Sequence, residues 1–335
     1  MEKVVAKNIP LSASFELTYA CNIRCNICYQ CPSEEKELTT GEIKTVLGQL
    51  VEAGCLYLSF TGGEPLLRPD FWQIAEYAKE KRFALILQTN GTLIDSWAAD
   101  KLKALSFLQV HISIFGAKDF THDKITQTAG SFNKAVNTAK LLIERGVTVI
   151  FKTTLMRENF AEYKEIKKLA DALGAKPYFS PVIYPKTDKN KQPLAQRLSD
   201  EQLRELFSFI FARDKIQPEI YEFKKDAALC QMGRTDCCIN PQGEVYPCVA
   251  VPIVVGSLKE KSFNQIWQGS DALRKLREIS LSQIEGCAEC ELAGMCIKCL
   301  GMSLLEEKDL LSAPTECCRI TKIIHKTHLP ANVHH

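Results

Sequence analysis

The sequence predicts an α/β protein built on a parallel sheet, followed by a smaller cysteine-rich region. From residue 12 to about 182, apolar or β-branched runs alternate with amphipathic stretches, as they do when helices connect parallel strands. The chain has 335 residues, beyond the size at which one hydrophobic core usually keeps growing. Its 15 cysteines are unevenly spread, because none lies between Cys55 and Cys230.

Local signals define the elements of the first part. Thr39 with Glu42 three residues later has the pattern of a capping box, and Gly146 and Gly174 follow helical stretches as C-terminal glycines do. The polar, proline-flanked segment 184–193 is typical of a linker or mobile loop. The expected strands are Ala13–Thr18, Leu56–Phe60, Ala84–Gln88, Leu108–Ile114, Val147–Thr154 and Lys176–Val182, and the expected helices are 41–53, 70–82, 94–104, 131–145, 159–173 and 200–213.

Chemically distinctive residues follow the first three strands. Cys21, Cys25 and Cys28 come after the first strand, the run Gly62-Gly63-Glu64 after the second, and Asn90 closes the third. In barrels of alternating strands and helices, function resides in the loops at the C-terminal ends of the strands. We therefore expect these residues to meet at one edge of the sheet.

The spacing Cys21-x3-Cys25-x2-Cys28 supplies three thiolates from one short loop. Iron–sulfur clusters are normally held by four thiolates, so three would leave one iron open. An open metal position is typical of a catalytic site. On spacing alone, a zinc site completed by Cys31 and ordinary buried thiols remain alternatives.

Composition favours a cytoplasmic protein with reduced, metal-binding thiols. The N-terminus lacks the apolar core of a signal peptide, and no run reaches the apolar length of a membrane span. Disulfides are rare in the cytosol, so 15 cysteines indicate metal binding. A net charge of +2 gives no electrostatic reason to expect a nucleic-acid or membrane partner.

The C-terminal cysteines form a second pattern. The run 240–247, Asn-Pro-Gln-Gly-Glu-Val-Tyr-Pro, predicts a tight hairpin that brings Cys230 and Cys248 towards each other. Paired Cys-x2-Cys spacings also suit structural zinc. The cysteines of this region are Cys230, Cys237, Cys238, Cys248, Cys287, Cys290, Cys296, Cys299, Cys317 and Cys318.

Together these features resemble the radical S-adenosylmethionine (SAM) enzymes that carry a C-terminal SPASM domain. The resemblance implies a partial (β/α)6 TIM-type barrel over residues 12–183, a linker and helix over 184–225, and a SPASM domain over 226–335. It implies a [4Fe–4S] cluster on Cys21, Cys25 and Cys28 whose open iron binds SAM. Reductive cleavage of SAM would then give a 5′-deoxyadenosyl radical that abstracts a hydrogen atom from the substrate.

The same resemblance implies roles for further residues. The run Gly62-Gly63-Glu64 matches the motif that receives the SAM amino group, in which glycines allow close backbone approach and the carboxylate accepts from the amine. Asn90 resembles the polar residue that closes the third strand, and Ser113 the strand-four serine that contacts the SAM ribose. The segment His122–Thr126 resembles one common to SPASM proteins, and its role stays open.

For the C-terminal region the resemblance implies two auxiliary [4Fe–4S] clusters. The spacing Cys296-x2-Cys299 is one residue shorter than is usual in the family. Cys31 and Cys55 are left over, with one member of each adjacent pair, as small buried residues. The implied ligands are Cys230, Cys237, Cys248 and Cys299 for the inner cluster, with Cys238 as the alternative to Cys237, and Cys287, Cys290, Cys296 and either Cys317 or Cys318 for the outer one.

The resemblance implies an anaerobic oxidoreductase or maturase that most often crosslinks or oxidises a ribosomally synthesised peptide. Because the barrel begins near residue 12, we expect a separate leader-binding protein, together with an electron donor such as flavodoxin or ferredoxin. The alternative is a small-molecule substrate, with decarboxylation or oxidation of a tetrapyrrole side chain. Sulfatase maturation is disfavoured because Val249, not Asp, follows Cys248. A non-catalytic iron–sulfur carrier or zinc scaffold would leave Gly62-Gly63-Glu64 unexplained.

Overall fold

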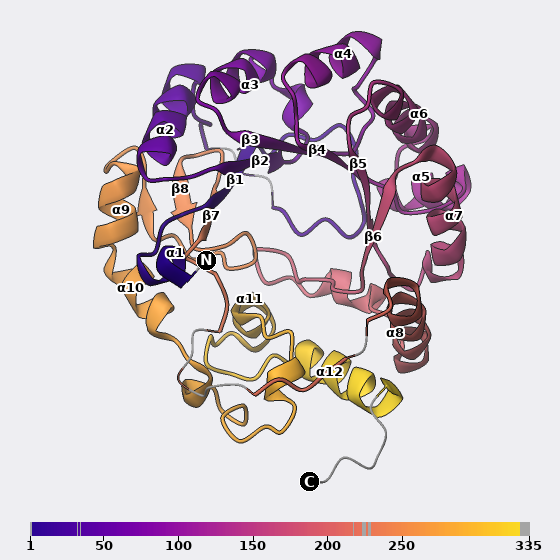
Figure 1. Cartoon of the computed structure of the whole chain (residues 1–335), viewed down its shortest axis with the longest axis vertical. Helices are drawn as coiled ribbons and strands as arrows, with labels where there is room; N and C mark the ends of the chain where they lie inside the picture. Colours follow the sequence, from indigo (N-terminus) through magenta and orange to yellow (C-terminus); the bar gives the residue numbers. More distant parts are fainter. Residues whose placement is uncertain are drawn as a thin grey trace.

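A computed structural model describes residues 2–31, 33, 35–216, 218–222, 226 and 229–328. One sheet runs through it in the strand order β6-β5-β4-β3-β2-β1-β7-β8-β9. Neighbouring strands from β6 to β1, and the pair β1 and β7, are parallel, whereas β7, β8 and β9 are antiparallel. The sheet curves into an open barrel with helices along its outer side (Figure 1).

The barrel strands agree with the sequence prediction to within two residues at each end. They are β1 (Ser12–Thr18), β2 (Tyr57–Gly62), β3 (Ala84–Thr89), β4 (Gln109–Ser113), β5 (Val149–Thr154) and β6 (Lys176–Ser180). The helices of this part are α1 (Glu2–Ala6), α2 (Thr40–Glu52), α3 (Phe71–Glu80), α4 (Ser96–Ala104), α5 (Asp119–Thr126), α6 (Ser131–Glu144), α7 (Tyr163–Leu173) and α8 (Asp200–Asp214). The short helix α5 was not predicted, because three of its four buried residues are polar and form no apolar stripe.

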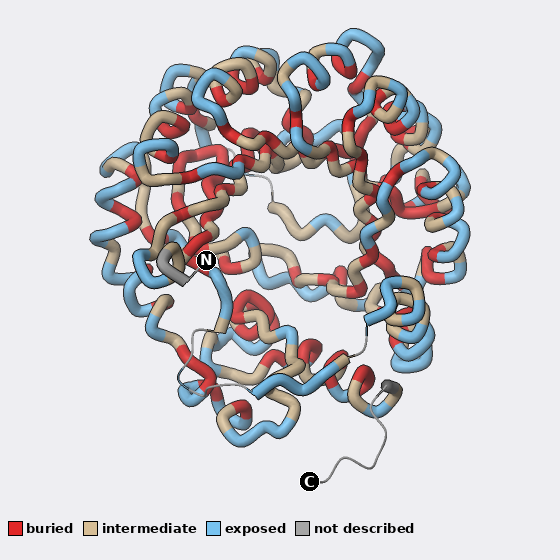
Figure 2. The backbone as a smooth tube through the Cα atoms, in the orientation of Figure 1, coloured by how far each residue is buried: buried red, intermediate tan, exposed pale blue. Residues whose placement is uncertain are grey.

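The main core lies between the outer face of the sheet and the helices. Alternate residues of each strand are buried against the helices, as Phe60, Leu87 and Phe151 show, while the intervening residues face the concave side. Figure 2 shows this buried layer as a band between the strands and the outer ring of helices. The concave side is therefore free to carry polar residues.

Helix α2 illustrates how local sequence builds this layer. The Thr39 side chain accepts from the backbone N–H of Glu42, and the Glu42 carboxylate accepts from the backbone N–H of Thr39, which confirms the predicted capping box. Ile43, Val46, Leu47 and Leu50 then recur at helical spacing and are all buried.

The cysteine-rich part continues the same sheet. Strand β7 pairs in parallel with β1, so the sheet has no break at the boundary expected near residue 226. The predicted hairpin forms between β7 and β8, with the Asn240 N–H donating to the Glu244 carbonyl at 3.0 Å. The elements here are β7 (Asp236–Ile239), β8 (Glu244–Tyr246), β9 (Gly256–Ser257), α9 (Phe263–Gly269), α10 (Asp271–Glu278), α11 (Leu300–Met302) and α12 (Thr315–His328).

The predicted linker has structure of its own. The Thr187 N–H donates to the Tyr29 carbonyl at 2.9 Å, which ties the segment to the first cysteine loop. Arg197 pairs with Glu306 at 2.5 Å and, more distantly, with Glu316, and all three side chains are nearly buried. The segment therefore fastens the barrel to the C-terminal region; residues 217 and 223–225 of the expected linker lie outside the described part.

Candidate active site

The N-terminal cysteine loop opens on a cavity of about 570 Å³ at the C-terminal ends of the first four barrel strands. This volume is in the range of small-molecule sites. The predicted site residues that line the cavity are Cys21, Cys25, Cys28, Gly62, Gly63, Asn90 and Ser113, and Glu64 is not among its lining residues. The fold thus brings the loops after β1 to β4 together as expected.

The three N-terminal thiols converge. Burial raises the pKa of the Cys25 thiol to about 12, and the neighbouring Cys28 and Cys21 thiols contribute. Three thiols that disfavour one another's ionisation suit a cation that stabilises all three thiolates. Within the described residues, no three His, Cys, Asp or Glu side chains are grouped as ligands of a single metal ion.

The cysteine loop is held by the unpredicted helix α5. The backbone N–H groups of Arg24 and Asn26 each donate at 3.0 Å to the carbonyls of Thr126 and Ile125 at the end of this helix. Asp123 in turn accepts from the backbone N–H groups at the start of α6, at 2.6 and 2.8 Å. The segment whose role the sequence left open therefore supports the loop.

His122 lies in the same support. It is 1% exposed, and its Nδ1 accepts from the Phe115 N–H at 3.1 Å. Burial lowers the pKa of His122 to about 4. The imidazole is therefore neutral at pH 7, which leaves Nδ1 free to accept.

Gly62 and Gly63 are required by backbone packing. A Cβ on Gly63 would lie 2.1 Å from the Ala20 carbonyl oxygen, and one on Gly62 would lie 2.3 Å from that of Thr18. Gly62 also has φ of +127°, which L residues rarely adopt. The Gly63 N–H donates to Thr18 at 2.7 Å. The glycines thus let the β2 loop run directly against the backbone that leads into the cysteines.

Glu64 differs from the expectation. Its carboxylate is fully buried and accepts from the Thr89 hydroxyl at 2.9 Å and from the Asn90 N–H at 2.8 Å. Burial raises the pKa of Glu64 to about 7, against these hydrogen bonds. The carboxylate joins the β2 loop to the end of β3 and is not among the residues that line the cavity.

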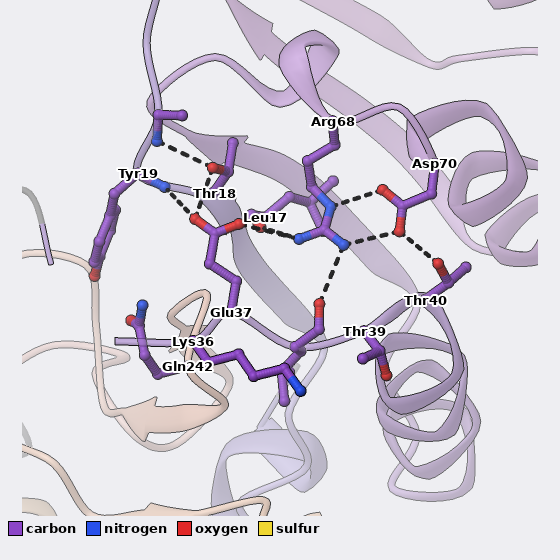
Figure 3. A network of polar contacts seen from close by, with 12 residues as sticks. Leu17, Thr18, Tyr19, Lys36, Glu37, Thr39, Thr40, Arg68, Asp70 and Gln242 are labelled. Atoms are coloured by element: carbon purple, nitrogen blue, oxygen red, sulfur yellow. Dashed lines mark hydrogen bonds and ion pairs between the residues drawn. The ribbon is translucent and has the colours of Figure 1, made fainter. Parts of the chain in front are cut away.

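Arg68 joins the end of β1 to the segments around Glu37 and Asp70, a role that was not predicted from the sequence. Its guanidinium donates to Asp70, to Glu37 and to the carbonyls of Leu17 and Leu38 (Figure 3). The available signal was a charged Arg-Pro-Asp run shortly after the glycines.

Glu37 continues this network towards the cysteines. Its carboxylate accepts from the Thr18 hydroxyl at 2.7 Å and from the Tyr19 N–H at 3.1 Å (Figure 3). Both the entry to the cysteine loop at Thr18 and its exit at Glu37 are therefore fixed to Arg68.

Asn90 and Ser113 complete the cavity wall. The Asn90 side chain donates to Asn22 at 2.8 Å and accepts from the Thr92 N–H at 2.8 Å, so it bridges the cysteine loop and the end of β3. Ser113 ends β4 and pairs in register with Lys152 on β5. Asn90 is thus occupied in positioning the loop, whereas Ser113 faces the cavity.

The C-terminal thiols fall into two groups. Burial raises the pKa of Cys248 to about 11, with contributions from the neighbouring Cys299 and Cys230 thiols, which defines the first group. Burial likewise raises the pKa of Cys287, with contributions first from Cys318 and then from Cys296 and Cys290. These four form the second group.

Cys317 lies between the groups. It is 1% exposed, its Sγ contacts the Met302 sulfur at 3.5 Å, and Cys299 and Cys296 both add to the burial that raises its pKa. Of Cys317 and Cys318, it is therefore Cys318 that belongs to the second group, with Cys287, Cys290 and Cys296.

Strand alternation separates the two candidate ligands Cys237 and Cys238. Cys237 pairs with Ala13 and Cys238 with Ser14, so the two side chains point to opposite faces of the sheet. Cys237 is buried in the main core, and burial raises its pKa well above the ordinary value, with a smaller contribution from the Cys55 thiol. Cys238 instead lines a small cavity of about 210 Å³ together with Cys248 and Cys31.

The comparisons with known proteins agree with this site. The profile of the radical SAM superfamily matches residues 15–170, and that of the SPASM iron–sulfur cluster-binding domain matches residues 230–291. The chain therefore belongs to the radical SAM enzymes with a SPASM domain. Its cofactors are SAM, a [4Fe–4S] cluster and auxiliary iron–sulfur clusters.

Individual relatives have different activities. The chain is 26% identical to the AdoMet-dependent heme synthase of Methanosarcina barkeri, over 94% of this chain and 98% of the relative. It is 30% identical to the mycofactocin maturase MftC of Mycolicibacterium smegmatis, over 84% of this chain and 75% of the relative. Streptococcus suis SuiB bound to S-adenosylmethionine has the same fold, with a TM-score of 0.73 and 17% identity over 95% of this chain and 78% of SuiB. Among the described helices, none is both long and apolar enough to span a membrane.

Proposed function

We propose that this enzyme matures a ribosomally synthesised peptide by hydrogen-atom abstraction, forming a crosslink or oxidising a side chain. The observation that carries the proposal is the convergence of three thiols on a cavity of about 570 Å³ walled by the Gly62–Gly63 backbone. When bound there, the cluster and SAM supply a one-electron cleavage that yields a hydrogen-abstracting radical.

The chain's own residues would hold and orient these groups. Cys21, Cys25 and Cys28 would ligate the cluster, the Gly62–Gly63 backbone would meet the methionine end of SAM, and Ser113 would meet its ribose. Arg68 and Glu64 would fix the loops and so hold the reacting atoms in one orientation. Holding reacting groups in the correct orientation supplies much of the rate acceleration of enzymes.

The two C-terminal thiol groups support a role in electron transfer. Cys230, Cys248 and Cys299 would hold the inner auxiliary cluster, and Cys238 is the favoured fourth ligand because it lines the same small cavity as Cys248. Cys287, Cys290, Cys296 and Cys318 would hold the outer one. With an electron donor such as flavodoxin or ferredoxin, this arrangement suits oxidation of a substrate radical.

A tetrapyrrole substrate is the second candidate, and one observation favours it. The likeness to the heme synthase extends over nearly the whole of both chains. The match to the mycofactocin maturase is shorter and covers 84% of this chain and 75% of the relative.

The test is an anaerobic reconstitution of the full chain. We expect about twelve irons per chain if all three clusters are [4Fe–4S], and 5′-deoxyadenosine from SAM when a reductant is added. Cys25→Ala should abolish SAM cleavage, Cys290→Ala should lose iron but retain cleavage, and Cys55→Ala, in the core, should behave as the wild type. SAM cleavage by Cys25→Ala would refute the proposal.

The substrate class needs a separate measurement. A pool of short synthetic peptides and, separately, a propionate-bearing tetrapyrrole are each added to the reduced enzyme. Formation of 5′-deoxyadenosine above the substrate-free rate, with a mass change in the added compound, identifies the class. Stimulation by the tetrapyrrole alone would replace the peptide assignment.

A further inference from the structure

A second cavity of about 330 Å³ adjoins the one at the cysteine loop. Tyr29 and Gln88 line both cavities, so the two share a wall. The second cavity extends along β5 and β6 and into the segment that follows β6, with Lys152, Tyr178 and Tyr184 among its lining residues. A molecule that reaches the first cavity from this side would pass these side chains.

Lys152 occupies a conspicuous position in this cavity. It pairs in register with Ser113 on β4 and with Tyr178 on β6, so the three residues lie side by side at one level of the sheet. Its neighbours on β5, Phe151 and Thr153, are buried against the helices, so alternation places Lys152 on the concave side.

The Lys152 ammonium has no carboxylate partner among the described residues. Burial alone lowers its pKa, with no acidic group opposing this effect. The ammonium instead lies over the ring of Tyr178, with Nζ 3.6 Å from the ring centre. Neither cavity has an Asp or Glu among its described lining residues. A half-buried cation without a counter-charge is costly unless a ligand supplies the anion.

The surroundings favour a carboxylate as that anion. His111, on the adjacent strand, has its pKa lowered to about 4 by burial and by Lys152, so it adds no competing positive charge at neutral pH. The Tyr178 ring covers one side of the ammonium and leaves its remaining N–H donors for a compact acceptor. Charge-assisted hydrogen bonds of this kind are among the strong ones in proteins.

The far end of the same cavity reaches the C-terminal thiols. The Tyr184 hydroxyl lies 3.6 Å from the Cys299 sulfur. A substrate anchored at Lys152 would therefore lie between the SAM cavity, on the Ser113 side, and the inner group of thiols. A substrate must lie between these two places if its radical is formed at the SAM cavity and is then oxidised by a cluster at the C-terminal thiols.

We propose that Lys152 forms a substrate subsite that binds a carboxylate of the molecule to be modified. This inference rests on the proposed function, because it takes the adjoining cavity to be the place of hydrogen abstraction. The carboxylate can be an acidic peptide side chain or a propionate of a tetrapyrrole. The subsite is thus a specificity determinant shared by both candidate substrate classes.

The experiment compares each acid with an uncharged counterpart. Binding to the SAM-loaded, cluster-loaded full chain is measured by anaerobic calorimetry. One pair is the acetylated tripeptide amide Phe-Glu-Phe and its Phe-Gln-Phe analogue, and the other is coproporphyrin III and its tetramethyl ester. The variants are Lys152→Met, Lys152→Arg, and Lys140→Met as an exposed lysine control on α6.

We expect wild type to bind the acid of at least one pair about tenfold more tightly than its uncharged counterpart. Lys152→Met should abolish that preference, Lys152→Arg should retain part of it, and Lys140→Met should keep it in full. The pair that shows the preference identifies the source of the carboxylate.

Equal binding of acid and counterpart by the wild type in both pairs would overturn the subsite, as would an unchanged preference in Lys152→Met. Failure of the proposed function would be visible separately. In that case the wild-type protein would form no 5′-deoxyadenosine from SAM, whatever the result of the binding measurements.

Discussion

Replacement of Arg68 by Met tests whether one guanidinium holds the two ends of the cysteine loop. Arg68 donates to Asp70 at 2.9 and 2.8 Å, to the carbonyls of Leu17 and Leu38 at 3.1 Å each, and to Glu37 at 3.2 Å. Its side chain is 11% exposed, so the variant takes the charged donor away from two carboxylates and two backbone carbonyls. Breaking a buried ion pair costs about 3–5 kcal/mol.

Partial exposure reduces that cost. The Glu37 side chain is 32% exposed and that of Asp70 is 17% exposed, so water replaces part of what is lost. We therefore expect Arg68→Met to lower the free energy of unfolding by about 3 kcal/mol, at the low end of the buried range. Because both ends of the cysteine loop depend on Arg68, the Kd for SAM should also rise by about tenfold.

The assay is urea unfolding of the metal-free full chain, followed by anaerobic SAM binding to the reconstituted protein. The matched control is Arg145→Met, since Arg145 on the outer helices bonds Asp100 at 2.6 Å but that carboxylate is 65% exposed. The control should lose much less stability and none of the SAM affinity. Equal losses in the two variants would refute the reasoning.

Three further predictions concern the glycines, the supporting histidine and the adjacent cysteines. Gly63→Ala should lose SAM binding and about 2–4 kcal/mol of stability, because its Cβ would meet the Ala20 carbonyl oxygen at 2.1 Å. Gly41→Ala is the control: a Cβ there has no atom within 4 Å, so it should stabilise α2 slightly. Equal unfolding midpoints of the two variants would contradict this prediction. The pKa of His122 is about 4 in the folded state and ordinarily near 6.5. The neutral imidazole therefore adds to the free energy of unfolding above pH 6.5, and this contribution is lost as the pH falls towards 4. Wild type should therefore lose about 2 kcal/mol more than His122→Asn between pH 7 and pH 5 in urea titrations, and parallel curves would exclude the effect. Finally, Cys237→Ala should bind as much iron as wild type, whereas Cys318→Ala should bind up to about four irons fewer; loss of iron in Cys237→Ala would restore it as a ligand.

Much of the candidate site could be predicted because its signals are local in the sequence. The spacing of Cys21, Cys25 and Cys28 fits one loop around one cluster. Strand periodicity then placed that loop at the same sheet edge as the Gly62-Gly63-Glu64 run, and Gly62 and Gly63 line one cavity together with the three cysteines. Capping and turn signals, such as those of Thr39 and Asn240, act over a few residues and were equally readable.

The roles of individual side chains were less accessible. Glu64 was expected to face the ligand, yet it is buried against Thr89 and Asn90. The glycines were expected to make room for a ligand, yet they make room first for the backbone of Thr18 and Ala20. Each outcome depends on a segment distant in sequence, which no local pattern specifies.

By itself, the sequence predicted the alternating fold from its periodicity. Its resemblance to a known family predicted the class of enzyme and the three thiols proposed for the first cluster, because those thiols are spaced within one short loop. Only the tertiary structure decided which of two adjacent cysteines faces which side. Pairing of β7 with β1 places Cys237 in the core and Cys238 at the cavity of about 210 Å³. The register of that pairing is set by contacts between segments more than 200 residues apart. The same holds for Lys152: that it has no carboxylate partner among the described residues becomes visible only once the strands are placed side by side.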